Sequence, residues 1–314
     1  MTSTHPAVEL TGLRKSFGPV TAVDGLDLTV HAGEVVAFLG PNGAGKTTTI
    51  DMLLGLARPD AGEVRLLGGT PADAVRYGRV AAVMQSGGLL KDLTVAETVR
   101  MTAHFFGRTR PVAEVLERAG IADLADRPVG KCSGGQQQRL RFALALLPDP
   151  DVMVLDEPTT GMDVEGRRDF WQAIRADARS GRTIIFATHY LDEADAYADR
   201  IVLVRQGRVV ADGTTAEIKN LAAGRTVRAT LPGADQAGLA ALPGAETVEV
   251  RGDSVLIRTG DSDAVARHLL TRTAARDVEI TSHNLEDAFL ALTTAGGHPT
   301  APAPALTAPA TIGA

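Results

Sequence analysis

Several residue types and patterns that mark large protein classes are almost absent from this chain. Its 314 residues contain one cysteine, Cys132, so no intramolecular disulfide can form. No apolar run approaches the roughly 20 residues that a membrane-spanning helix needs. The first ten residues also lack the basic-then-apolar pattern of a secretion signal. We therefore expect a cytosolic protein, or one that reaches a membrane through a partner.

Positive charge is neither abundant nor concentrated in the sequence. Lysine and arginine together number 32 against 38 acidic residues, which gives a net charge of −6. Proteins that bind nucleic acid usually carry a basic patch or stripe, and none is visible here, so no nucleic-acid partner is expected. The 44% hydrophobic content is typical of a globular protein, and the length suffices for one large domain and a smaller one.

The most informative segment that is present is a glycine-rich loop at residues 40–48. It follows an apolar strand pattern, precedes a helical pattern and matches the phosphate loop G-x-x-x-x-G-K-[ST]. Glycines let backbone N–H groups point at phosphate oxygens, and the helix behind adds its positive end. Lys46 is expected to reach the β- and γ-phosphates, and the Thr47 hydroxyl to bind Mg²⁺. The loop residues predicted to bind nucleotide are Gly40, Pro41, Asn42, Gly43, Ala44, Gly45, Lys46, Thr47 and Thr48.

A second nucleotide motif is the apolar run at residues 152–155, which ends in Asp156 and Glu157. In a phosphate-loop protein the aspartate at such a strand end holds Mg²⁺, directly or through water. Glu157 is then placed to polarise a water for attack on the γ-phosphate. The alternative is that both acids merely leave a buried strand for solvent, which the upstream phosphate loop disfavours.

Residues 132–136 read Cys-Ser-Gly-Gly-Gln, and with them the chain resembles the ATP-binding-cassette (ABC) ATPases. The family signature is Leu-Ser-Gly-Gly-Gln, so only Cys132 departs from it. The resemblance implies that Ser133 and Gly135 contact the γ-phosphate bound to another protomer. It places Gly134 and Gln136 in the same nucleotide-binding motif.

The resemblance assigns roles to four further positions. Phe17 matches the aromatic residue that stacks on adenine, although a core phenylalanine is the alternative. Gln85 matches the glutamine that touches Mg²⁺ and relays to the membrane partner. Asp163 matches the loop that crosses the dimer interface. His189 matches the switch histidine that hydrogen-bonds the γ-phosphate.

The fold implied for residues 1–220 is an α/β phosphate-loop cassette, a RecA-like core with an antiparallel β subdomain and a helical subdomain. Each motif occurs once, so the chain holds one cassette and half of each of two composite ATP sites. A second copy, or a paralogous cassette, would complete them head to tail. Glu157, His189 and Lys46 would be catalytic. The side chains expected to organise Mg²⁺ are Thr47, Gln85 and Asp156.

The pattern changes near Asn220. We expect a small α+β domain over residues 221–294, with strands at 226–231, 246–251, 254–259 and 277–282 and helices at 235–241, 262–272 and 284–292. The alanine-, proline- and threonine-rich residues 295–314 cannot bury enough apolar surface to fold, and are expected to be disordered.

Three functions compete for this cassette: the motor of a membrane exporter, a non-transport ATPase acting on DNA or ribosomes, and a regulatory nucleotide-binding module. Long coiled coils, zinc-binding cysteines and a second cassette are missing, which disfavours the second. The third should have lost Glu157 or His189.

Residues 284–293 resemble the closing motif of ABC-2-type exporter ATPases, including the daunorubicin-resistance group. The same segment also reads as an amphipathic helix that packs the accessory domain onto the cassette or a second copy. The resemblance implies export of a drug, antibiotic or similar hydrophobic compound. A lipid or polysaccharide exporter is the alternative cargo class.

The expected partner is a separate polytopic ABC-2-type permease, which would hold the chain at the cytoplasmic face of the membrane. It would dock near Gln85 and residues 86–99. Leu89, Leu90 and Leu93 are candidates for its groove, with core packing as the alternative.

Overall fold

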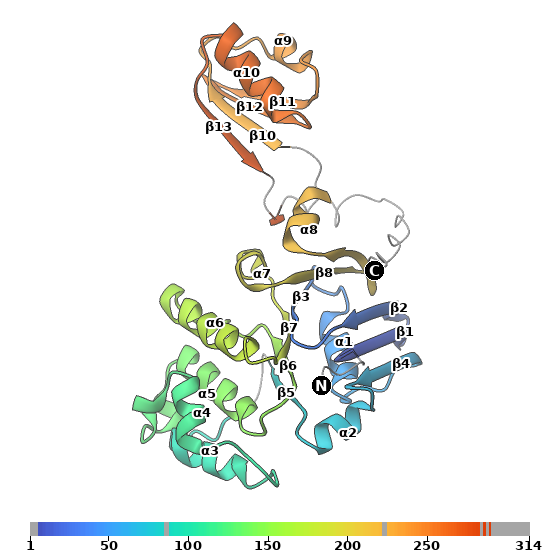
Figure 1. The fold of residues 1–314 in the computed structure, drawn as a ribbon, viewed down its shortest axis with the longest axis vertical. Helices are drawn as coiled ribbons and strands as arrows, with labels where there is room; N and C mark the ends of the chain where they lie inside the picture. Colours follow the sequence, from blue (N-terminus) through green and yellow to red (C-terminus); the bar gives the residue numbers. More distant parts are fainter. Residues whose placement is uncertain (1–5, 85–87, 222–224, 283–284, 287–288, 290–314) are drawn as a thin grey trace, which may run out of the picture.

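The described residues form three β-sheets with helices packed on them, and the strands of the first two sheets alternate along the chain (Figure 1). The computed structural model describes residues 6–84, 88–221, 225–282, 285–286 and 289, so Gln85 and the tail at 295–314 lie outside the described residues. In the described part, no helix combines the length and apolar composition of a membrane span.

The central sheet has six strands. The strand that precedes the phosphate loop lies inside the sheet, between two strands that come much later in the chain. Its strands, from edge to edge, are β5 (Val80–Val83), β6 (Val152–Asp156), β7 (Thr183–Ala187), β3 (Val35–Leu39), β8 (Arg200–Arg205) and β9 (Arg208–Gly213). All neighbours are parallel except β8 and β9. Every residue of β3, β6 and β7 is buried, as expected for parallel strands covered on both faces.

Successive residues of these strands belong to two separate hydrophobic clusters, one on each face. Val36 and Phe38 join the cluster that contains α1 (Lys46–Leu53), whereas Ala37 and Leu39 join the cluster of the helical layer. Figure 1 shows α1 and the helical layer on opposite sides of the sheet. This layer comprises α3 (Val95–Ala103), α4 (Val112–Arg118), α5 (Gly134–Leu146) and α6 (Val164–Ala178).

The second sheet is antiparallel and packs with α1 on its side of the central sheet. It consists of β2 (Val20–Val30), β1 (Val8–Phe17) and β4 (Ala61–Leu66). The remaining helices of the cassette are α2 (Pro71–Arg76), α7 (Leu191–Tyr197) and α8 (Thr215–Leu221). These architectural features confirm the predicted α/β cassette fold.

Helix boundaries in the helical layer follow from capping side chains. The spacing of Thr94 and Glu97 predicts a capping box, and it starts α3, where the two residues exchange hydrogen bonds. The residue pattern also predicts a helix over 137–147 after the signature glycines; this start is wrong, because α5 begins at Gly134. Ser133 is its N-cap and forms a second capping box with Gln136. Two satisfied N–H groups offset the poor helix propensity of the paired glycines.

The third sheet lies beyond α8 and has its own hydrophobic cluster (Figure 1). Its antiparallel strands are β11 (Ala245–Arg251), β12 (Ser254–Thr259), β10 (Arg225–Thr230) and β13 (Arg276–Ser282), and α9 (Gln236–Ala240) and α10 (Ser262–Arg272) pack on it. These bounds differ from the expected ones by no more than one residue at any end.

After this sheet, the chain returns to the cassette. Leu285 is 2% exposed and belongs to the helical-layer cluster of the central sheet, and Phe289 packs against the same cluster. Of the two alternatives for this segment, packing onto the cassette is therefore observed for these two residues.

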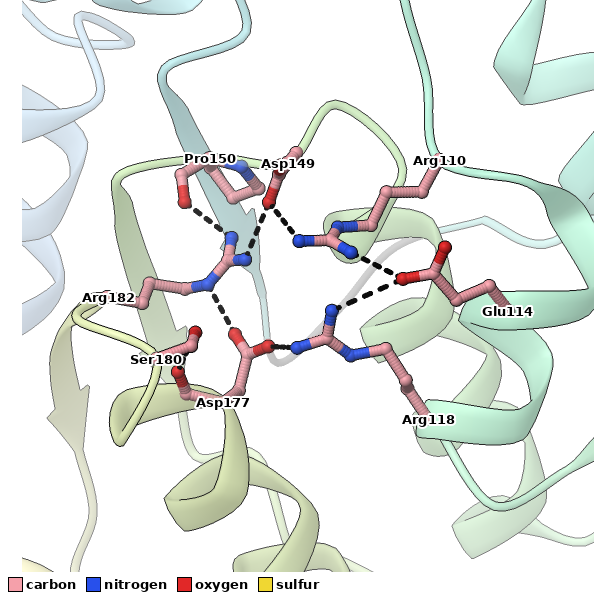
Figure 2. A network of polar contacts seen from close by, with 8 residues as sticks. All are labelled: Arg110, Glu114, Arg118, Asp149, Pro150, Asp177, Ser180 and Arg182. Atoms are coloured by element: carbon pink, nitrogen blue, oxygen red, sulfur yellow. Dashed lines mark hydrogen bonds and ion pairs between the residues drawn. The ribbon is translucent and has the colours of Figure 1, made fainter.

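Figure 2 shows six charged side chains that alternate in sign around a closed circuit, which we call the charge ring. Its members, in order, are Arg110, Glu114, Arg118, Asp177, Arg182 and Asp149. Asp149 contacts Arg110 at 2.8 Å and Arg182 at 2.9 Å, and Glu114 contacts Arg118 at 3.5 Å.

The charge ring joins α4 to α6 and to the loops at the amino ends of β6 and β7. Asp177 and Arg182 are 2% and 5% exposed, so their ion pair is shielded from solvent. Arg182 also donates to the carbonyl of Pro150, and Ser180 donates to the Asp177 carbonyl at 2.6 Å. The ring therefore fixes the helical layer against the edge of the sheet away from the phosphate loop.

Removing the buried carboxylate of this ring should destabilise the protein strongly. Asp177→Ala removes the buried partner of Arg182 and leaves it only the more exposed Asp149 as an acidic partner, and breaking a buried ion pair costs about 3–5 kcal/mol. Asp151→Ala is the matched control, since its pair with Arg79 is about half exposed on both sides and such pairs contribute about 0–1 kcal/mol. Urea denaturation measures both free energies of unfolding. Equal losses in the two variants would contradict the role given to the ring.

Candidate functional site

The phosphate loop is held by close backbone approaches that only glycine permits. A Cβ atom on Gly45 would lie 2.2 Å from the carbonyl oxygen of Ala22, and one on Gly40 would lie 2.3 Å from that of Val204. Gly45 also has a φ of 98°, which side-chain-bearing residues rarely adopt. The loop is thus pressed between β2 of the antiparallel sheet and β8 of the central sheet.

Lys46 lies at the start of α1 and folds back over this loop. Its ammonium donates to the carbonyl of Gly40 at 2.6 Å and to that of Pro41 at 3.2 Å. Burial lowers the pKa of Lys46, while the nearby carboxylates of Glu157 and Asp156 oppose that shift. A phosphate beside the ammonium would favour its charged form in the same way.

The turn between β8 and β9 is hydrogen-bonded to the phosphate loop, a contact that the sequence motifs did not predict. The Gly207 N–H donates to the Ala44 carbonyl at 2.9 Å, and the Gly207 carbonyl accepts from the Asp24 N–H at 2.9 Å. Gly207 has a φ of 74°, and a Cβ there would lie 2.7 Å from the Ala22 oxygen. The Gln-Gly pair at 206–207 was the available signal.

Asp156 and Glu157 end β6 with different environments. Asp156 is 5% exposed, and burial together with the charge of Glu157 raises its pKa, which Lys46 partly opposes. Glu157 keeps its place in the sheet, because its N–H donates to the Ala187 carbonyl at 2.8 Å. Its φ of 50° is left-handed, so the chain turns sharply there.

His189 follows β7 and meets Glu157 directly. Its Nδ1 lies 2.7 Å from Glu157 Oε2, and the Thr160 hydroxyl donates to the same oxygen at 3.2 Å. The structure thus brings together four predicted residues, Lys46, Asp156, Glu157 and His189, at the carboxyl ends of neighbouring parallel strands.

The side chains available here fit a magnesium ion that is shared with a nucleotide. Mg²⁺ is usually held by one or two carboxylates together with substrate phosphates and waters. Asp156 supplies a carboxylate, and Thr47 supplies a hydroxyl on the first turn of α1. Within the described ranges, no group of three or more histidine, cysteine or acidic residues could hold a metal by itself. The donor set therefore suits a site that needs phosphate oxygens for completion.

Phe17 is an exposed aromatic at the end of β1 and not a core residue. Its exposed fraction is 56%, and the ammonium of Lys15 lies 5.5 Å from its ring centroid. The β1–β2 register pairs Ser16 with Thr21, next to the Ala22 that backs Gly45. The hairpin end with Phe17 therefore stands beside the phosphate loop, and the core alternative is wrong.

The signature residues lie on the other side of the sheet from α1. Ser133 to Gln136 begin α5, and a Cβ on Gly134 or Gly135 would contact Gly161 or Met162 of the same chain. Asp163 caps α6 by accepting from the Gly166 N–H at 2.7 Å. The structure therefore brings the signature and Asp163 together, and separates both from the phosphate loop of their own chain.

Comparisons with known proteins agree with this geometry. A family model described as "ABC transporter" matches residues 23–160. The Nod factor export ATP-binding protein I of Burkholderia lata is 38% identical over 295 residues, which cover 91% of this chain and 96% of that protein. The daunorubicin/doxorubicin resistance ATP-binding protein DrrA of Streptomyces peucetius is 38% identical over 311 residues, which cover 93% of each.

Solved structures show the same fold over the cassette. A nucleotide-free ATP-binding cassette from an ABC transporter superposes with a TM-score of 0.62 at 26% identity, covering 68% of this chain and 94% of the other. A dimeric cassette in a post-hydrolysis state with ADP and Pi gives 0.60 at 27% identity, covering 66% and 98%. The chain therefore belongs to the ABC transporter ATP-binding proteins, in the branch of the Nod factor export and daunorubicin/doxorubicin resistance proteins, and its activity is ATP hydrolysis.

Proposed function

We propose that this chain is the ATP-hydrolysing motor subunit of a bacterial exporter, which drives a drug, antibiotic or similar hydrophobic compound through a separate ABC-2-type permease. The observation that carries the export assignment is the extent of the similarity to DrrA. That alignment covers 93% of this chain, so it continues well past the cassette into the third sheet. Cassettes of many kinds share the first 220 residues, whereas the segment beyond them separates branches.

Hydrolysis in this proposal follows from the cluster at the strand ends. Lys46 and the loop N–H groups bind the β- and γ-phosphates, and Asp156, Thr47 and Gln85 hold Mg²⁺, which neutralises phosphate charge when bound. Glu157 accepts a proton from, or orients, the attacking water. His189 donates a hydrogen bond to the γ-phosphate from its exposed side, while its Nδ1 contacts Glu157.

The two-sided sheet supports a head-to-tail dimer. Because α1 and α5 cover opposite faces, Ser133 and Gly135 are not placed to reach a nucleotide on Lys46 of the same chain. A second copy turned head to tail can present its signature to that nucleotide. ATP between the copies supplies the charge that both faces bind, so hydrolysis releases the contact. A paralogous cassette could take the second position.

A groove beside the helical layer supports docking of the permease. Its volume is about 730 Å³, and its lining includes Arg76, Tyr77, Phe105, Phe106, Arg108 and Pro148. Tyr77 and Phe105 are 69% and 80% exposed, so a partner can cover them. We call this the docking groove; its lining also includes Arg110, Glu114 and Asp149, and we define its occupant as a cytoplasmic permease helix with an apolar face and acidic flanks. Occupation of the groove would hold the chain at the cytoplasmic face of the membrane.

The leucines proposed earlier contribute unequally to such a surface. Leu89 is partly buried and packs against the helical-layer cluster, so core packing describes it. Leu90 is 54% exposed, so a partner can cover it. Gln85 remains the proposed relay.

The cargo divides into two candidates. The DrrA relative supports a drug or antibiotic, in line with the closing motif at residues 284–293. The Nod factor export relatives reach the same 38% identity, so the similarity does not single out a drug cargo, and a lipid or polysaccharide stays the second candidate. The proposed domain division is the same for either cargo: a cassette at 1–220, an accessory domain at 221–294 and a disordered tail at 295–314.

Glu157→Gln should abolish turnover while retaining ATP binding. The amide keeps the shape of the side chain but cannot accept a proton, and loss of a general base typically lowers the rate about 10²- to 10⁴-fold. ATP should then trap the dimer, which size-exclusion chromatography with multi-angle light scattering detects. Glu279→Gln, an exposed change in the third sheet, is the control. Undiminished turnover in Glu157→Gln would remove this residue from its role.

Phe17→Ala should weaken ATP binding without lowering stability. Stacking of a base on an aromatic side chain contributes about 1–3 kcal/mol by alanine substitution, and the exposed ring of Phe17 supports no core. We expect the Kd for ATP, measured by calorimetry, to rise about tenfold with Tm unchanged. Phe17→Tyr should retain affinity. An unchanged Kd in Phe17→Ala would mean that adenine is bound elsewhere.

Charging the docking groove should separate the motor from its permease. Tyr77→Asp with Phe105→Asp places two acids where an apolar face docks, so permease co-purification should be lost while basal ATPase activity persists. Leu270→Asp is the matched control, because Leu270 is similarly exposed, at 59%, on the third sheet's helix. Co-purification that survives the double change, or fails equally in the control, would place the permease elsewhere.

A further inference from the structure

Glu193 is a buried acid that the proposed chemistry does not use. It lies in the first turn of α7 and is 2% exposed. Both of its oxygens are occupied: Oε1 accepts from the Thr159 hydroxyl at 2.5 Å and Oε2 accepts from the Thr188 hydroxyl at 2.9 Å. An ionised carboxylate forms stronger hydrogen bonds than a neutral acceptor, especially away from solvent.

The two threonines belong to the two loops that carry the catalytic pair. Thr159 follows Glu157 by two residues, and Thr188 immediately precedes His189. The Thr188 hydroxyl also accepts from the Tyr190 N–H at 3.0 Å, which closes a turn around His189. One carboxylate therefore links the segments whose side chains meet at 2.7 Å.

A third element reaches Glu193 through Arg167 of α6. The Arg167 Nε lies 3.5 Å from Glu193 Oε1, and its guanidinium lies 4.2 Å from the ring centroid of Tyr190. That ring in turn lies 4.0 Å from the ring of His189. Because α6 begins directly after Asp163, the same carboxylate also contacts the helix that presents the proposed dimer-interface loop.

The chemistry of the acceptor explains why an acid occupies this position. Burying a carboxylate is unfavourable unless donors compensate it, and a neutral side chain would avoid that penalty. A carboxylate, however, accepts at both oxygens and so orients two hydroxyl groups at once. A glutamine has one acceptor oxygen, so one of the two threonine hydroxyls loses its acceptor.

We infer that Glu193 is a positioning residue that holds the Glu157 and His189 loops in one arrangement, so that the pair reaches the γ-phosphate as a unit. This inference rests on the proposed function, since it assumes that Glu157 and His189 act in hydrolysis. Glu193 itself touches neither of them and acts through Thr159 and Thr188.

Paired substitutions of the threonines separate positioning from packing. Thr159 and Thr188 are each 1% exposed. Thr188→Val keeps the volume and loses the hydroxyl, whereas Thr188→Ser keeps the hydroxyl and loses a methyl group; Thr159→Val and Thr159→Ser form a second pair. Positioning predicts that the serine variants retain kcat and the valine variants lose it. A packing role predicts the reverse order, because serine leaves a cavity.

The magnitude follows from one hydrogen bond to a charged group, about 1.5–3 kcal/mol, which corresponds to a roughly 10- to 150-fold loss of kcat. We expect this loss in Thr188→Val, Thr159→Val and Glu193→Gln, with KM and the Kd for ATP changed less than about twofold. Thr188→Val added to Glu193→Gln should lower kcat little further, since both remove the same link. Steady-state ATPase assays on the full chain, with Tm recorded for each variant, provide these values.

Three outcomes would overturn the inference: valine variants that match the serine variants in kcat, losses that appear in KM, or fully additive effects. The threonine pairs keep the test decisive if Glu193→Gln does not fold. Glu157→Gln, assayed in parallel, distinguishes failure of the positioning role from failure of the proposed function. If it abolishes turnover while the valine variants do not lose kcat, only the positioning role fails. If Glu157→Gln leaves turnover intact, the proposed function itself fails.

Discussion

The parallel alignment of β3, β6 and β7 is the constraint on which the site depends. Parallel strands end at the same edge, so the residues that follow them emerge side by side even when the sequence separates them widely. Phe38 lies opposite Ala187, and Ala187 lies opposite Asp156. The phosphate loop, the acidic pair and His189 are thus assembled by backbone hydrogen bonds before any side chain interacts. The antiparallel sheet and the turn at Gly207 then press the phosphate loop into a shape that only glycine permits.

The central sheet brings the phosphate loop, the acidic pair and His189 together, but the signature motif of the same chain lies on its other side. Buried on both faces, it separates α1 from α5 by its full thickness, and the charge ring fixes the helical layer at the edge away from the site. Three ring members, Arg110, Glu114 and Asp149, also line the docking groove. A permease helix in the groove would therefore contact the ion pairs that set the position of the helical layer, and with it the start of α5. In the proposed complex, that arrangement would give a mechanical route between the membrane partner and the signature motif.

The sequence predicted those features whose residues are contiguous in the chain, and missed those whose residues are distant from one another. The phosphate loop, the acidic pair and the capping box at Thr94 are local patterns, and the structure places each as expected. In the third sheet, turn residues lie at both ends of β11 and β12, which explains why the bounds of these two strands agreed. The charge ring and the contacts of Glu193 were invisible, because Arg118 and Asp177 or Thr159 and Glu193 become neighbours only through the packing of separate helices and loops. The start of α5 was misplaced because its two glycines disfavour a helix, although the capping box of Ser133 and Gln136 that begins it is itself a local pattern.

Glu157 shows why the loops around the site need such support. Its left-handed φ of 50° is unfavourable for a residue with a side chain, and conformations of this kind persist only where the surroundings over-determine them. Here the Ala187 carbonyl holds the Glu157 N–H on one side, and the contacts of Thr159 with Glu193 anchor the chain two residues later on the other. The strained residue is therefore fixed at both ends by β7 and by α7, the strand and helix that flank His189. The left-handed conformation of Glu157 therefore depends on the same strand and helix that position His189.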